Sequence, residues 1–194
     1  MVDLFLTYCC QMLKVFLCIV QNLKTMENII EKVSAETVVI SPEQLLRHWQ
    51  NHRKLTRRVI EAFPEKELYE YSIGGMRPFA ELAMEIVGMA VPGMKGIVTG
   101  NWENGQEVFS KKVPATKEAL LKLWDETTNE INQLWAKIPA HRFQEVDRAF
   151  GLYEGPGYFT IWYWIDNEIH HRGQGYVYLR SLGIEPPPFW DRGI

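Results

Sequence analysis

The sequence predicts an all-α protein built as a four-helix bundle. Four stretches carry apolar residues at helical spacing, prolines and glycines separate these stretches, and no set of alternating segments typical of strands is present. Four amphipathic helices bury their apolar stripes most simply by packing against one another. With 194 residues, 46% of them hydrophobic, the chain is long enough for one domain with a substantial core.

The first helix is predicted over residues 42–63, because Ser41 is a typical N-cap and proline suits the first helical position. Its apolar residues are Leu45, Leu46, Trp49, Leu55, Val59, Ile60 and Phe63. A loop containing Gly74 and Gly75 follows. The second helix is predicted over residues 77–91, where we expect Pro92 and the glycine after it to interrupt the helix.

Residues 93–114 are mixed in character and predict a helical remnant followed by a long crossing loop. The third helix is predicted to open at Thr116, a suitable cap, and to stop at Pro139. After a glycine-rich loop, the fourth and longest helix runs to about Leu182, and Gly183 ends it. The long link between the second and third helices can cross the bundle and leave those two helices parallel.

The first 25 residues differ from the rest of the chain. They are apolar but interrupted by charged and polar residues, and they match neither a secretory signal nor a membrane span. We expect residues 1–25 to be an appendage that an upstream start codon adds, and residues 26–194 to be the folded domain. All three cysteines lie in the appendage, which favours a reducing, cytoplasmic compartment over a disulfide framework.

The charge of the chain argues against nucleic acid as a partner. Its formal net charge is −3 and its pI is near 6.0. The nearest basic cluster, residues 52–58, has helical spacing and predicts a solvated face. His48 and His52 are four residues apart and could chelate a metal, but their polar neighbours favour a partly solvated face as well.

A polar row on the fourth helix is the most informative feature. At about 100° per residue, six polar or amphipathic side chains share one stripe of an otherwise apolar helix: Thr160, Tyr163, Asn167, His171, Gln174 and Tyr178. A helix that is apolar nearly all round is usually buried, and buried polar groups need partners. Glu85 projects from the apolar face of the second helix, so it can meet Asn167 and His171 if the two helices pack together.

Two interpretations of these three residues stay open. Carboxylate, amide and imidazole groups from two helices can ligate one divalent metal, such as zinc, nickel, iron or manganese. They can equally form a structural hydrogen-bond network. His170 lies off the stripe and is expected to play a supporting or interface role.

Three further features concern the packing of the fourth helix. Arg172 is expected to pair with Glu168 four residues earlier. Gly173 and Gly175 lower helix propensity, so we expect them to permit close approach of another helix. Together with the apolar coverage, they favour a homodimer.

The stretch from Asn167 to Gly183, Asn-Glu-Ile-His-His-Arg-Gly-Gln-Gly-Tyr-Val-Tyr-Leu-Arg-Ser-Leu-Gly, resembles the last helix of the DinB family of damage-inducible proteins, which includes YfiT-like proteins. Residues 76–86 and 46–53 resemble its second and first helices. The resemblance implies an up-down-down-up bundle with a long crossover between helices two and three. It also implies a divalent metal held by three histidines, whose positions fall on Glu85, Asn167 and His171.

Some members of the family are transferases or isomerases that use a low-molecular-weight thiol such as bacillithiol. The sequence therefore supports two functions. The first is a metal-dependent enzyme, a thiol transferase or related hydrolase with a Glu85–Asn167–His171 site. The second is a non-catalytic, stress-related protein with a degenerate metal site that binds a small molecule or acts as a homodimer. Neither nucleic acid nor membrane is an expected partner.

Overall fold

The computed structural model describes residues 21, 24–26, 39–105 and 112–193, in two units divided after Pro42. The boundary expected at Met26 falls in the first unit. The appendage expected over residues 1–25 lies almost wholly outside the described residues, so the domain boundary stays a prediction. The helical fold and the candidate site lie in the second unit, Glu43–Ile194.

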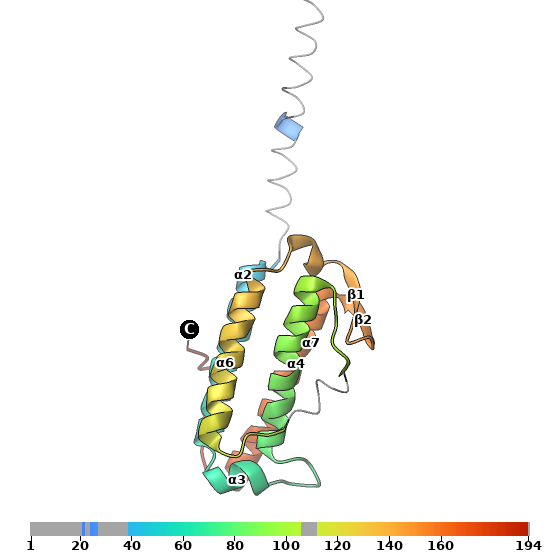
Figure 1. Ribbon diagram of the computed structural model, residues 1–194. Coiled ribbons are helices and arrows are strands. Elements are labelled where there is room, and N and C mark those ends of the chain that lie inside the picture. Colours follow the sequence, from blue (N-terminus) through green and yellow to red (C-terminus); the bar gives the residue numbers. More distant parts are fainter. Residues whose placement is uncertain (1–20, 22–23, 27–38, 106–111, 194) are drawn as a thin grey trace, which may run out of the picture. The chain divides into compact units, whose positions relative to one another are not determined.

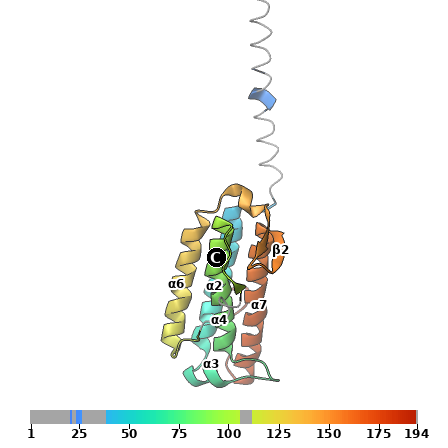
Figure 2. The ribbon, with the colours of Figure 1, turned by 45° about the vertical axis from the view of Figure 1, so that its right-hand side comes forward.

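The fold is mostly helical, as the sequence predicts. Its four long helices are α2 (Pro42–Ala62), α4 (Phe79–Thr99), α6 (Lys117–Trp135) and α7 (Gly157–Ser181). The colours of Figure 1 show α2 and α7 running in one direction and α4 and α6 in the other, and Figure 2 shows the same four helices from a second side. Helix α4 packs against both α6 and α7.

Several helix ends follow the local signals. Helix α2 begins at Pro42, and the side chain of Thr116 caps α6 by accepting a hydrogen bond from the Ala119 amide at 3.2 Å. Gly183 follows α7 with a φ of +75°, a left-handed conformation that favours glycine.

The structure corrects three expectations. Helix α4 continues through Pro92 to Thr99, because this segment is buried in the core and its packing outweighs the lost hydrogen bond. A short helix, α3 (Glu65–Glu70), follows the first helix. A hairpin of β1 (Val146–Ala149) and β2 (Tyr153–Pro156) stands where only a loop was expected, so the fold is not purely helical. A 3₁₀ turn, η1 (Ala140–Phe143), precedes it.

Helix α4 is the most deeply buried element. Among the described residues it is also the one helix long and apolar enough to cross a membrane, but 78% of its most apolar window is buried inside the protein. A core helix passes the same test of length and composition. Gly175 lets α7 approach α4 closely, because a Cβ there would overlap the Phe79 ring, whereas a Cβ at Gly173 would meet nothing within 4 Å.

The prediction of a solvated face on the first helix is wrong for His52 and Arg53. Both side chains are buried, at 2% and 1% exposure. Arg53 lies 4.0 Å over the Trp124 ring and donates a hydrogen bond to Thr128 of α6 at 2.6 Å. The basic cluster is thus partly a packing element between α2 and α6.

Candidate functional site

Helices α4 and α7 bring Glu85, Asn167 and His171 together. The Nε2 atom of His171 lies 2.9 Å from Oε1 of Glu85, and the side-chain nitrogen of Asn167 donates to the same oxygen at 3.2 Å. Asn167 and His171 approach each other to 3.3 Å. The structure therefore places the carboxylate of α4 opposite the polar row of α7, as the sequence predicts.

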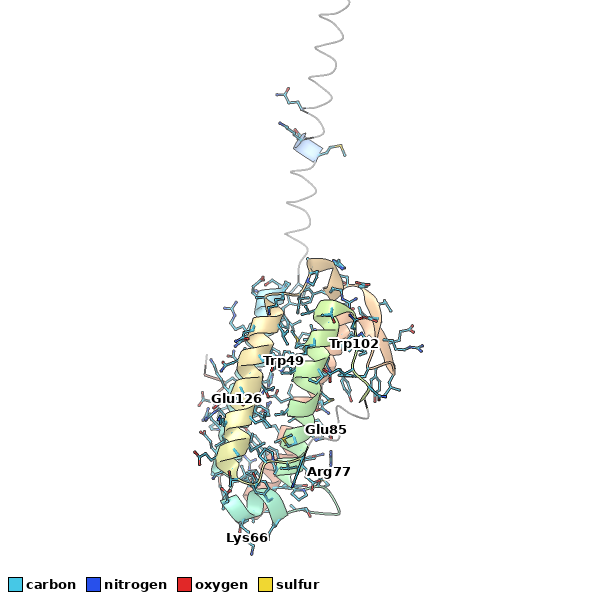
Figure 3. The ribbon with its side chains drawn as sticks, in the orientation of Figure 1. Trp49, Lys66, Arg77, Glu85, Trp102 and Glu126 are labelled. Atoms are coloured by element: carbon cyan, nitrogen blue, oxygen red, sulfur yellow. The ribbon has the colours of Figure 1, made fainter. Side chains whose placement is uncertain are left out.

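Arg77 completes the surroundings of the carboxylate. It precedes α4 and donates a hydrogen bond to Oε2 of Glu85, whereas His171 and Asn167 contact Oε1. Figure 3 shows the labelled Arg77, just before the start of α4, close to Glu85 on that helix. Burial would raise the pKa of Glu85, but hydrogen bonds from Arg77, His171 and Asn167 outweigh burial and lower it from 4.5 to about 2. Glu85 is thus an anion at every physiological pH.

The other members of the polar row support this group or line the space beside it. The oxygen of the Gln174 amide lies 3.3 Å from Nδ1 of His171, where it can accept that proton. The Tyr178 hydroxyl donates to the backbone oxygen of Arg77 at 3.0 Å, which anchors the residue that holds Glu85. Thr160 and Tyr163 line a cavity at the other end of the row.

The cavity has a volume of about 790 Å³ and adjoins Glu85. This size is typical of sites for small organic ligands. Helix α4, helix α7, the β1–β2 hairpin and the segment before α6 form its walls. Its lining residues are Arg77, Glu81, Met84, Glu85, Met89, Lys112, Val113, Ala149, Phe150, Leu152, Tyr153, Glu154, Phe159, Thr160, Tyr163 and Trp164.

Sequence reasoning missed Arg77 and the hairpin wall. Arg77 lies eight residues before Glu85, which is about two helical turns, but it stands in the loop that precedes the helix. Phe150 and Gly151 at the hairpin turn both have positive φ, and a phenylalanine there is not a typical turn signal. Glycine at residue 151 was the available clue to a turn.

A second polar group lies on the α2 side of α7 and is fully buried. Thr56 donates to Glu168 at 2.6 Å, and Arg53 and Arg172 each lie 3.8 Å from the Glu168 carboxylate. The predicted pair between Arg172 and Glu168 is confirmed, and both side chains are buried. Burial raises the pKa of Glu168, and Arg53 is the largest opposing influence.

His52 belongs to this second group. Arg172 lies 2.8 Å from its Nδ1 and Arg192 3.3 Å from its Nε2. Burial lowers the pKa of His52, and Arg172, Arg192 and His48 lower it further, to about 3. With two guanidinium groups at its ring nitrogens, His52 has no room to chelate a cation with His48.

Comparison with known proteins identifies the same family over most of the chain. The profile of the DinB family matches residues 32–192. Protein YjoA of Bacillus subtilis (strain 168) is 25% identical over 152 residues, which cover 77% of this chain and 96% of YjoA.

Solved structures show the same fold. The crystal structure of YjoA matches with a TM-score of 0.61 at 21% identity, covering 76% of this chain and 97% of that one. A DinB-like protein from Bacillus cereus ATCC 10987 gives the same TM-score and coverage at 18% identity. A variant of mycothiol-dependent maleylpyruvate isomerase gives 0.56 at 16% identity, covering 74% of this chain and 68% of that one.

Proposed function

The chain belongs to the DinB family, and we propose that its up-down-down-up bundle binds a divalent cation through Glu85, Asn167 and His171. The observation that carries this proposal is the convergence of a carboxylate, an amide and an imidazole from two helices, with their facing atoms 2.9–3.3 Å apart. Donors that share one metal ion lie at such separations, because each bond is about 2.0–2.2 Å long.

The buried amide of Asn167 supports the fit. Its side-chain oxygen is buried and has no hydrogen-bond partner among the described residues. The oxygen and nitrogen of a side-chain amide are nearly interchangeable in shape. Turning the amide over would point its oxygen at Glu85 and His171. When Nε2 of His171 carries no proton, the three groups are all acceptors, and a cation between them would satisfy all three.

The surroundings of His171 also suit a metal ligand. When Nδ1 donates its proton to Gln174, the lone pair of Nε2 points at Glu85 and Asn167. Zinc, nickel, iron and manganese all accept this donor set. Among the described residues no group of three His, Cys, Asp or Glu could hold a metal, and the proposed site uses an amide as its third donor.

The proposed activity is thiol transfer or a related hydrolysis, with a low-molecular-weight thiol such as bacillithiol as co-substrate in the cytoplasm. Its support is the family and the fold shared with mycothiol-dependent maleylpyruvate isomerase. A bound divalent metal supplies Lewis acidity, which lowers the pKa of a thiol or water. In this chain Arg77 holds Glu85, Gln174 orients His171, and the cavity receives the substrate.

The closed network around Glu85 favours a second candidate function. Arg77 and His171 can neutralise the carboxylate without a metal, so the site suits a non-catalytic, stress-related binding protein with a degenerate metal centre. Such a protein would act as a homodimer. Three exposed apolar residues of α7 that do not line the cavity support a subunit interface: Tyr158, Ile169 and Val177.

Metal content separates the two functions. Protein purified without a histidine tag is dialysed against each divalent cation and analysed by mass spectrometry, beside His171→Ala and His141→Ala. His141 is the matched control, because its side chain is 72% exposed on η1. We expect about one ion per chain in the wild type and in His141→Ala, and a loss of at least about tenfold in His171→Ala. Equal and negligible metal content in all three proteins would exclude the metal-dependent enzyme and leave the non-catalytic binding protein as the function.

A further inference from the structure

We propose that the cavity beside Glu85 binds a ligand whose body is an aromatic ring system. The inference rests on the proposed function, since it names the ligand class of the same site. Its argument comes from the cavity wall rather than from the cation ligands.

Exposed apolar side chains gather at this cavity. Leu152, Tyr153, Phe159 and Tyr163, here called the apolar rim, all line it and are 50–64% exposed. Exposed apolar surface that clusters around a hollow marks a binding site, because scattered single residues are the norm elsewhere. A ligand seated in the cavity would remove this surface from water.

The rim and the wall behind it favour rings over aliphatic chains. Tyr153 of β2 and Tyr163 of α7 present nearly parallel rings, with centroids 6.3 Å apart and an interplanar angle of 23°. Trp164 and Phe150 line the interior. Aromatic pairs gain from edge-to-face and offset-stacked contact beyond the area they bury, so a ring in this cavity gains more than an alkyl group of equal area.

The backbone of the hairpin is bent to build this wall. Phe150 has a φ of +55°, which is rare for a bulky residue and costs conformational energy. Its side chain is only 6% exposed, lines the cavity and contacts the Trp102 ring at 5.4 Å between centroids. The packing of this ring into the wall holds the residue in the unfavourable conformation.

The charges of the lining do not select a polyanion. Its acidic residues are Glu81, Glu85 and Glu154, and its basic residues are Arg77 and Lys112. Arg77 already pairs with Glu85. Recognition of the ligand body therefore depends on the rings, and the polar end of the ligand lies toward Arg77 and Glu85.

Fluorescence titration with 1-aminoanthracene, a neutral aromatic probe, tests the inference. We expect one saturable site per chain and a loss of affinity of at least about fivefold in Tyr163→Ala. Val177→Ala is the matched control, because Val177 is also an exposed apolar residue of α7 but does not line the cavity. Circular dichroism and thermal unfolding show that both variants fold.

A competition experiment distinguishes an aromatic ligand from an aliphatic one. We expect 2-naphthol to displace the probe at a concentration at least about fivefold lower than 1-octanol does. Equal potency of the two competitors, absence of a saturable site, or equal affinity of Tyr163→Ala and Val177→Ala would each overturn the inference. His171→Ala separates the two proposals, since it should lose the cation and keep the probe. Wild-type protein that binds the probe but takes up no metal would overturn the proposed cation site and leave the aromatic-ligand site standing.

Discussion

His52 makes the stability of the protein sensitive to mild acid. Its imidazole is 2% exposed, and guanidinium groups of Arg172 and Arg192 lie at its two ring nitrogens. Burial and these cations lower the pKa of His52 from 6.5 to about 3. Between pH 6.5 and about pH 3, the imidazole is therefore protonated in the unfolded chain and neutral in the folded chain. Stability falls as the pH falls below 6.5, and the loss is complete near pH 3.

The size of the effect follows from the two pKa values. At pH 5 the unfolded imidazole, with its pKa of 6.5, is almost fully protonated, whereas the folded one, with its pKa of about 3, is neutral. Integrating proton uptake from about pH 7.5 to about pH 5 gives a loss of about 2 kcal/mol in the free energy of unfolding. For a domain of this size that corresponds to a fall in Tm of about 4–8 °C. Burial also lowers the pKa of His48, so this residue contributes in the same direction.

Urea unfolding of the wild type and His52→Asn at both pH values measures the effect. The asparagine oxygen lies near the position of Nδ1, so it can still accept from Arg172, and it does not titrate. We expect the wild type to lose about 2 kcal/mol on acidification and His52→Asn to lose less than half of that. His141→Asn, whose side chain is exposed, should behave like the wild type. Equal losses in the wild type and His52→Asn would refute the reasoning.

Two further predictions concern packing and buried charge. Gly93→Ala should destabilise the fold by about 1–3 kcal/mol, because its Cβ would overlap a tryptophan ring of α7, whereas Gly173→Ala meets nothing within 4 Å and should stabilise it by up to about 1 kcal/mol. A higher Tm for Gly93→Ala than for Gly173→Ala in thermal unfolding would contradict this prediction. Arg53→Ala leaves the buried Glu168 without its main cation and should cost about 3–5 kcal/mol, against less than about 1 kcal/mol for Arg58→Ala at an exposed ion pair. Similar urea midpoints for the two arginine variants would show that Arg53 does not compensate the buried charge.

The helices could be predicted because their signals are local. The periodic apolar residues of α2, α6 and α7, and Thr116 as a cap, act within a few residues of the chain. Pro92 shows the limit of such signals. The proline removes one backbone hydrogen bond, but residues 79–97 of α4 are almost continuously buried. The packing that offsets the proline comes from other helices, which a local pattern does not contain.

The centre of the site could be predicted for a related reason. A polar row on a helix that is otherwise apolar must meet a partner, and Glu85 was the polar residue available on the facing apolar stripe. Arg77 could not be predicted, since its position depends on the loop before α4. The burial of His52 and Arg53 was also hidden, because a run of basic residues at helical spacing usually faces water.

Two polar faces of α7 act together to hold the site. Asn167 and His171 face α4, while Glu168 and Arg172, each one residue further along the chain and about 100° around the helix, face α2. A rotation of α7 that removed the first pair from Glu85 would also break the buried bonds of the second pair with α2. Because unpaired buried charges cost several kcal/mol, the network with α2 fixes the rotation of α7. The residues that face Glu85 are therefore positioned by contacts that a neighbouring face of the same helix makes with α2.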